Sequence, residues 1–183
     1  MSISEETINQ IAQNFITTEA NQAPIEPTAK FYEGLTPAEA YRVQQAIITR
    51  LAQQGSKILG KKVGASSSAA QMALGVDEPL YGILLDLHQQ ESGKSISTAA
   101  LINPLLECEI TFIMNEALSG PDVTPDQVLA ATKAVVASFE IVDFRATGWK
   151  PGPAEAISYN VFARGFVLGQ TEVPVGEVDL AGV

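Results

Sequence analysis

The feature that most constrains the fold is a stretch of alternating side chains near the middle of the chain. From Glu107 to Met114 every second residue is apolar, and successive side chains of a β-strand point to opposite faces. Glu107 and Glu109 therefore share one face of a predicted strand, roughly 7 Å apart. Two carboxylates on so apolar a segment repel each other and lose hydration unless a cation lies between them. A divalent cation would satisfy both; a solvated acidic face is the simpler alternative.

Composition narrows the class of protein. The 183 residues fit one domain, and 46% of them are apolar, which is enough for a hydrophobic core. A net charge of −10 argues against nucleic acid or anionic membranes as partners, and favours small molecules or other subunits. The first residues lack the basic and apolar regions of a signal peptide, and no apolar run approaches the length that spans a bilayer. We therefore expect a cytoplasmic protein.

Histidine and cysteine are too rare for most metal clusters and catalytic triads. Cys108 is the single cysteine, so the chain has no internal disulfide, and His88 is the single histidine, which we expect in a loop. The candidate chemical groups are therefore carboxylates, lysines and hydroxyls.

Two amphipathic helices are predicted within residues 1–55, which we expect to form a helical region. Apolar residues recur at helical spacing from Ile8 onward, after a capping Ser4. In the second helix Thr36 and Glu39 fit a capping box, and Gly55 marks the end.

Residues 56–183 are predicted to form a sheet region made of short strands. An apolar strand at 57–59 leads into a polar turn at 60–68, whose lysines and serines could bind an anion or move a proton; plain solvated surface is the alternative. The other elements predicted here are a turn at 77–82, strands at 83–85, 138–145 and 160–169, and a helix that starts at the Thr124 cap and continues through Val136.

Glu140 is an acid within the predicted strand at 138–145. Its β-branched and aromatic neighbours would make an unpaired carboxylate costly. An ion pair with Arg145 or Lys150 is the simplest explanation for it.

Three short motifs in fixed order resemble the fumarylacetoacetate hydrolase superfamily. They are Gly60-x-Lys62-x-Gly64, Glu107-x-Glu109 and Glu140-Ile141-Val142-Asp143-x-Arg145. Within that superfamily, the sequence is similar to the 2-keto-4-pentenoate hydratases and 4-oxalocrotonate decarboxylases of aromatic degradation. This resemblance implies that Glu107, Glu109 and Glu140 bind Mg²⁺ or Mn²⁺, that Lys62 is catalytic, and that Ser66 and Tyr81 contact the substrate.

The resemblance also implies a fold and a reaction. The fold would be α+β, with N-terminal helices packed on a mixed, curved β-roll whose C-terminal part is shortened. Strands near Glu107 or Gly165 would then have an exposed edge or an uncovered apolar face. The reaction would be a metal-dependent lyase step on a small 2-oxo acid in a homo-oligomer. Hydration of 2-hydroxypentadienoate is favoured over decarboxylation of 4-oxalocrotonate, although Leu80 stands where hydratases often carry an acid. A truncated, non-catalytic relative that acts as a binding or assembly subunit is the other alternative.

Overall fold

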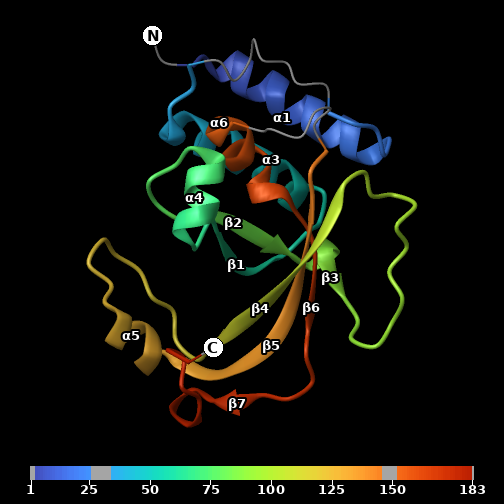
Figure 1. The fold of residues 1–183 in the computed structure, drawn as a ribbon. Coiled ribbons are helices and arrows are strands. Elements are labelled where there is room, and N and C mark those ends of the chain that lie inside the picture. The colour runs from blue at the N-terminus through green and yellow to red at the C-terminus, as the bar shows by residue number, and fades with distance from the viewer. Residues whose placement is uncertain (1–2, 26–33, 146–151, 183) are drawn as a thin grey trace.

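Helices cover one end of the molecule and a long curved ribbon of strands extends away from them (Figure 1). The computed structural model describes residues 3–25, 34–145 and 152–182. Its helices are α1 (Glu5–Ala20), α3 (Pro37–Gln53), α4 (Ser68–Leu74), α5 (Pro125–Ala130) and α6 (Pro153–Ser158), with short 3-10 helices η1 (Asp86–His88), η2 (Asn160–Phe162) and η3 (Val175–Glu177). Its strands are β1 (Ile58–Gly64), β2 (Leu80–Leu85), β3 (Gln89–Gln90), β4 (Pro104–Met114), β5 (Thr132–Asp143), β6 (Ala163–Leu168) and β7 (Val173–Pro174).

The two N-terminal helices form where their caps predict them. The Ser4 side chain accepts a hydrogen bond from the Thr7 N–H, and Thr36 and Glu39 form a complete capping box. Each helix buries one apolar stripe, and α1, α3 and α6 pack together above the sheets (Figure 1). None of the described helices is both long enough and apolar enough to cross a membrane.

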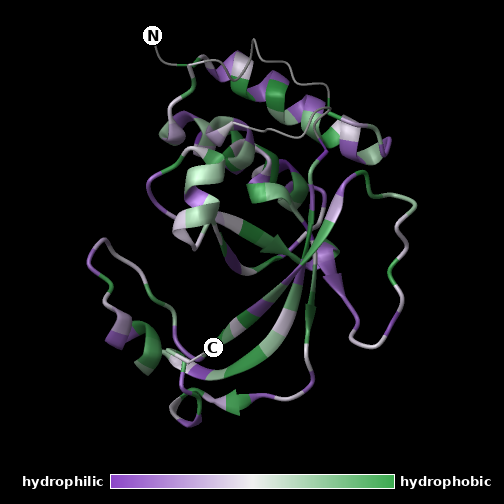
Figure 2. Ribbon diagram, in the orientation of Figure 1, coloured by the Kyte–Doolittle hydropathy of each residue, from purple (hydrophilic) through white to green (hydrophobic). Residues whose placement is uncertain are grey.

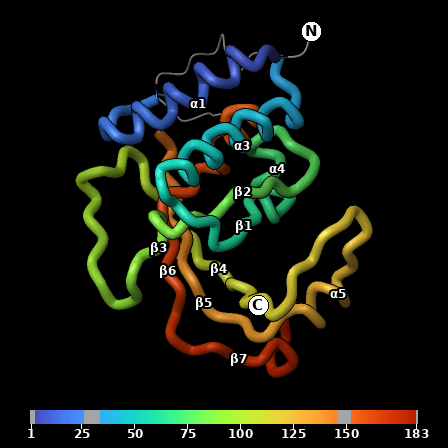
Figure 3. The backbone as a smooth tube through the Cα atoms, turned by 180° about the vertical axis from the view of Figure 1, so that it is seen from behind, coloured from blue at the N-terminus to red at the C-terminus, as the bar shows by residue number. Residues whose placement is uncertain are grey.

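The strands form two sheets. β1 and β2 make an antiparallel pair, and the second sheet has the order β3-β6-β5-β4, with β7 also paired to β5. Seen from behind, β1 and β2 lie between the helices and the β4–β5 ribbon (Figure 3). The predicted α+β architecture, helices on a curved mixed sheet, is confirmed.

β4 is an edge strand with an uncovered apolar surface. It pairs with β5 over its whole length and has no second neighbour among the described residues. Apolar residues continue along the part of the ribbon that extends beyond the helices (Figure 2). Large apolar side chains exposed on this ribbon are Leu105, Leu106, Phe112, Met114 and Phe139. The edge expected near Glu107 or Gly165 is therefore present at Glu107, whereas Gly165 lies on β6, which has β3 and β5 as neighbours.

Several predicted boundaries were wrong, because pairing between strands overrode the local pattern. The segment taken as a polar turn, 60–68, continues β1 as far as Gly64, and β2 begins at Leu80 rather than Ile83. The predicted helix through Val136 ends at Ala130, since the residues after it pair with β4 as β5.

Two further corrections concern residues 160–162 and His88. The predicted strand at 160–169 begins only at Ala163, because residues 160–162 form η2. His88, expected in a loop, ends η1 and is buried.

Candidate metal and catalytic site

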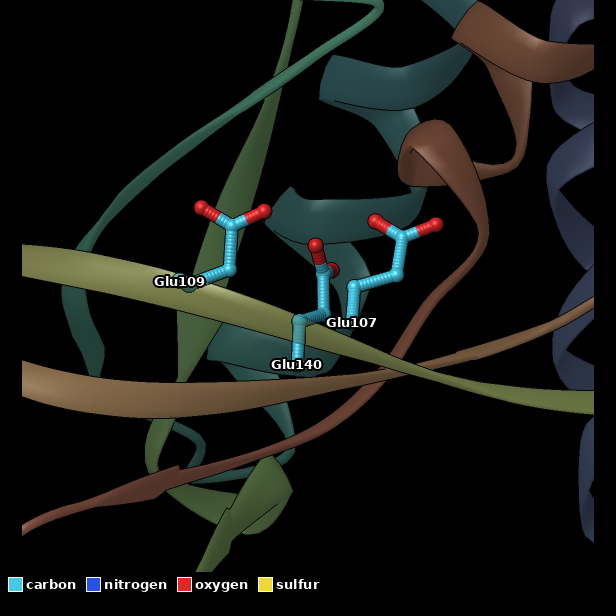
Figure 4. Close-up of side chains that lie close together, drawn as sticks. All are labelled: Glu107, Glu109 and Glu140. Carbon is cyan, nitrogen blue, oxygen red and sulfur yellow. The ribbon is translucent and has the colours of Figure 1, made fainter. Parts of the chain in front are cut away.

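Three glutamates converge on one face of the β4–β5 ribbon. Glu107 lies directly opposite Glu140 in the antiparallel register, and Glu109 is two residues further along β4 on the same face. Each residue offers a carboxylate oxygen, and these oxygens lie within 4.8 Å of one another. Figure 4 shows all three side chains projecting to the same side of the two strands. The alternation of side chains along the strand predicts that Glu107 and Glu109 share a face. The pairing of β4 with β5 then adds Glu140 to them.

The cluster carries more negative charge than its surroundings favour. Burial raises the pKa of Glu140; nearby Lys62 opposes this rise, and Glu107 and Glu109 add to it. The pKa of Glu109 is also raised, first by burial and then by Glu107. These carboxylates are therefore held where a further positive charge would be favourable.

Lys62 is the cation that faces this cluster. Its Nζ lies 2.7 Å from Glu140 Oε1 and donates a hydrogen bond of 2.9 Å to the Val161 carbonyl oxygen. The suggested partners of Glu140 were therefore wrong or untested: Arg145 pairs with Asp143 and Glu19, and Lys150 lies outside the described residues. Among the residues that the structure describes, three carboxylates face one ammonium group, which leaves two negative charges uncompensated.

Two glycines allow the backbone around Lys62 to approach closely. Gly82 lies directly opposite Lys62, and a Cβ there would lie 2.8 Å from the Asn160 carbonyl oxygen and 3.0 Å from Lys62 Cγ. A Cβ on Gly64 would lie 2.5 Å from Val161 Cγ1. Neither position has room for a larger residue.

The η2 segment contributes to the site, and the sequence reading missed it. Asn160, Val161 and Phe162 all have positive φ angles, of 56°, 51° and 59°. Asparagine tolerates this conformation, but β-branched valine does so only at a cost, so the local sequence gave little warning. This left-handed turn contains the carbonyl that accepts from Lys62.

The other two predicted site residues, Tyr81 and Ser66, differ in how the structure places them. Tyr81 is paired with Val63, so its side chain points to the face of the β1–β2 hairpin opposite that of Lys62. There it stacks on Tyr41, with ring centroids 4.3 Å apart. Ser66 is exposed in the turn between β1 and α4. The structure does not bring Tyr81 to the acidic cluster, and the role of Ser66 stays a prediction.

Two hollows in the structure are lined by residues outside the acidic cluster. One is a small cavity of about 10 Å³ beside Arg145, Phe15 and Tyr159, and the other is a surface groove between α1 and α3.

Comparison with known proteins gives a consistent result. No family model matches the chain. It is 33% identical over 174 residues to the 2-hydroxypent-2,4-dienoate hydratase of Pseudomonas putida, covering 94% of this chain and 78% of that enzyme. It is 31% identical to the 4-oxalocrotonate decarboxylase of Pseudomonas sp. (strain CF600), covering 98% of this chain and 68% of that enzyme. The chain belongs to the 2-keto-4-pentenoate hydratase and 4-oxalocrotonate decarboxylase family.

The fold of this hydratase/decarboxylase family member agrees with a solved relative. The 4-oxalocrotonate decarboxylase from Pseudomonas putida G7, complexed with magnesium and adipate, superposes with a TM-score of 0.93 at 30% identity. The match covers 98% of this chain and 68% of that chain. The shared fold therefore includes nearly all of this chain, with its acidic cluster.

Proposed function

We propose that this chain is a divalent-metal-dependent lyase that acts on a small 2-oxo acid, with hydration of 2-hydroxypentadienoate as the first candidate reaction. The observation that carries the proposal is the convergence of Glu107, Glu109 and Glu140 beside Lys62. Membership of a family of hydratases and decarboxylases supports the reaction class.

The donor set fits a hard divalent cation. Carboxylate oxygens are preferred ligands of Mg²⁺ and Mn²⁺, and the two uncompensated charges of the cluster match the charge of one such ion. Glu107, Glu109 and Glu140 would hold it. Two solved structures of a related decarboxylase were complexed with magnesium or calcium, which supports a divalent ion as the ligand of this cluster.

The chemistry that such an ion would supply is polarisation of a 2-oxo group, which stabilises negative charge that develops on the substrate. The protein supplies the proton-handling group. The Lys62 ammonium is nearly enclosed, with 8% of its side chain exposed, and is fixed between a carboxylate and a carbonyl. From there it could donate a proton to the substrate or pair with its carboxylate.

One observation favours the decarboxylase as a second candidate. Leu80 is buried in the hydrophobic core, two residues before Gly82 on the same face of β2. The leucine side chain has no group that could activate water. Hydration requires such activation, whereas loss of CO₂ does not. Two solved structures with high similarity to this chain are also of a 4-oxalocrotonate decarboxylase.

An assay with both substrates tests the proposal. Purified protein with Mg²⁺ is mixed with 2-hydroxypentadienoate or with 4-oxalocrotonate, and the ultraviolet absorbance of the substrate is followed. We expect turnover that is lost with EDTA and restored by Mg²⁺ or Mn²⁺. Glu116→Gln, which changes an exposed acid just after β4, is the matched control and should retain activity. If neither substrate is consumed, the non-catalytic alternative is favoured.

We also propose that the chain forms homo-oligomers. Leu106 and Phe112 on β4 and Phe139 on β5 are exposed on the face of the ribbon opposite the glutamates. Clustered apolar surface of this kind often marks an interaction site. Light scattering after size exclusion should give more than one copy per particle, and Phe139→Ser should lower that number.

A further inference from the structure

The outer edge of β2 is covered by side chains instead of another strand. The Tyr81 N–H donates to the Tyr41 hydroxyl at 3.2 Å, and Gln44 Nε2 donates to the Tyr81 carbonyl at 3.1 Å. Two residues further along, Asn160 Oδ1 accepts from the Ile83 N–H at 2.6 Å, and Asn160 Nδ2 donates to the Ile83 carbonyl at 2.8 Å. The Asn160 amide thus binds one backbone unit of β2 as a neighbouring strand would.

The same asparagine begins the left-handed turn of η2. Three successive left-handed residues, one of them the β-branched Val161, are unfavourable for L-residues, so surrounding contacts must hold them. The paired hydrogen bonds of Asn160 to Ile83 are such contacts. They fix the turn against the outer edge of β2. The other edge of β2 is paired with β1, the strand that carries Lys62.

We propose that Asn160 is the positioning residue for Lys62. By clamping η2 to β2, it holds the Val161 carbonyl where, with Glu140, it fixes the Lys62 ammonium between two acceptors. The close approaches at Gly64 and Gly82 belong to the same arrangement. The catalytic consequence rests on the proposed function, whereas the placement of Lys62 does not.

Gln44 provides a matched control for a purely structural role. Gln44 and Asn160 are both buried amides, with 3% and 4% of their surfaces exposed. Each bonds the outer edge of β2, and Gln44 also donates to the Ile157 carbonyl at 3.0 Å. However, Gln44 lies on α3 and none of its hydrogen bonds involves the turn that holds Lys62. Gln44→Leu should therefore lower stability without freeing Lys62.

Reductive methylation followed by residue-resolved mass spectrometry tests the placement directly. In the wild-type protein Lys62 should react slowly relative to the exposed Lys57 and Lys94. Asn160→Gly, which keeps the positive φ accessible, should raise the Lys62 rate about ten-fold through local opening, while Gln44→Leu leaves it within about two-fold. If Asn160→Gly does not fold, Asn160→Asp is measured against the same criteria. Unchanged protection of Lys62, or an equal rise in Gln44→Leu, would overturn the proposal.

Steady-state kinetics then test the catalytic consequence. Asn160→Gly should lower kcat about ten- to a hundred-fold while KM changes less than about two-fold, because a misplaced proton-handling group affects the transition state rather than substrate binding. Gln44→Leu should keep the wild-type kcat. A raised KM with unchanged kcat would refute the catalytic part. A wild-type protein without lyase activity would refute the proposed function, yet the methylation result would still decide where Lys62 is held.

Discussion

Two charged clusters lie only three residues apart on β5, and they differ in charge balance. Around Glu140, three carboxylates face one cation, Lys62, within the part of the chain that the structure describes. Around Asp143, two carboxylates face two guanidinium groups: Arg145 contacts both Asp143 and Glu19, and Arg164 contacts Glu19.

The second cluster is also satisfied by the backbone. Asp143 is 2% exposed and accepts hydrogen bonds from the N–H groups of Ile102, at 3.0 Å, and Asn103, at 2.8 Å. Its charges tie the end of α1 to β5 and balance in number among the described residues. A buried acid with balanced charge and backbone donors therefore indicates structure, whereas an acidic cluster short of positive charge indicates a binding site.

The largest expected effect is the loss of catalysis from the unbalanced cluster. Glu109→Gln should reduce turnover by more than about 10⁴-fold, about 5 kcal/mol in activation free energy, because it removes one proposed ligand. Its melting temperature should stay the same or rise, since like-charge repulsion is relieved. Turnover with Mg²⁺ and the melting temperature are measured for Glu109→Gln and for the control variant Glu116→Gln. Full activity in Glu109→Gln would remove the functional half of the comparison.

The balanced cluster should respond in the opposite way. Asp143→Asn should lower the free energy of unfolding by about 3 kcal/mol, because Arg145 then keeps a buried charge with one partner fewer. Turnover per folded molecule should not change. Urea unfolding gives the stability, and activity is normalised to the folded fraction. A stable but inactive Asp143→Asn protein would contradict the structural assignment.

Acidification should lower the free energy of unfolding through His88, whose pKa is affected by the arginines of the balanced cluster. Burial, followed by the charges of Arg164 and Arg145, lowers the pKa of His88 from 6.5 to about 4. The unfolded chain therefore gains a proton between pH 6.5 and 4 that the folded chain does not, so stability falls as the pH falls. Between pH 7 and 5 the loss should be about 2 kcal/mol. Urea midpoints of wild type minus those of His88→Gln isolate this effect, and an equal pH dependence in both proteins would contradict it.

The smallest effect is stabilisation by the ion itself. At ten times its dissociation constant, Mg²⁺ should add about 1.4 kcal/mol to the free energy of unfolding at pH 7. The gain should shrink at pH 5, because the raised pKa values of Glu140 and Glu109 let protons compete for the same oxygens. Thermal unfolding measures it in three proteins. Asp143→Asn should keep the increment and Glu109→Gln should lose it; the reverse pattern would show that the two clusters had been assigned the wrong way round.

Local sequence signals gave the helix starts but not all of the strand boundaries. The caps at Ser4, Thr36 and Thr124 each begin a helix, because a cap satisfies backbone donors within a few residues of itself. The helix after Thr124 was predicted too long, since the apolar residues beyond Ala130 fit a helical stripe as well as a strand. Only their pairing with β4 decides between the two.

That Glu107 and Glu109 share a face follows from the sequence, because alternation along a strand is a local property. The rest of the site depends on contacts between segments that are far apart in the chain. The pairing register of β4 and β5 places Glu140 opposite Glu107. Glu140 forms its ion pair with Lys62 of β1 and not with Arg145, which is closer in sequence. The left-handed turn at Asn160 also depends on contacts with β2, far away in the chain. A contact between distant segments depends on how whole elements pack, which no short pattern of residues encodes.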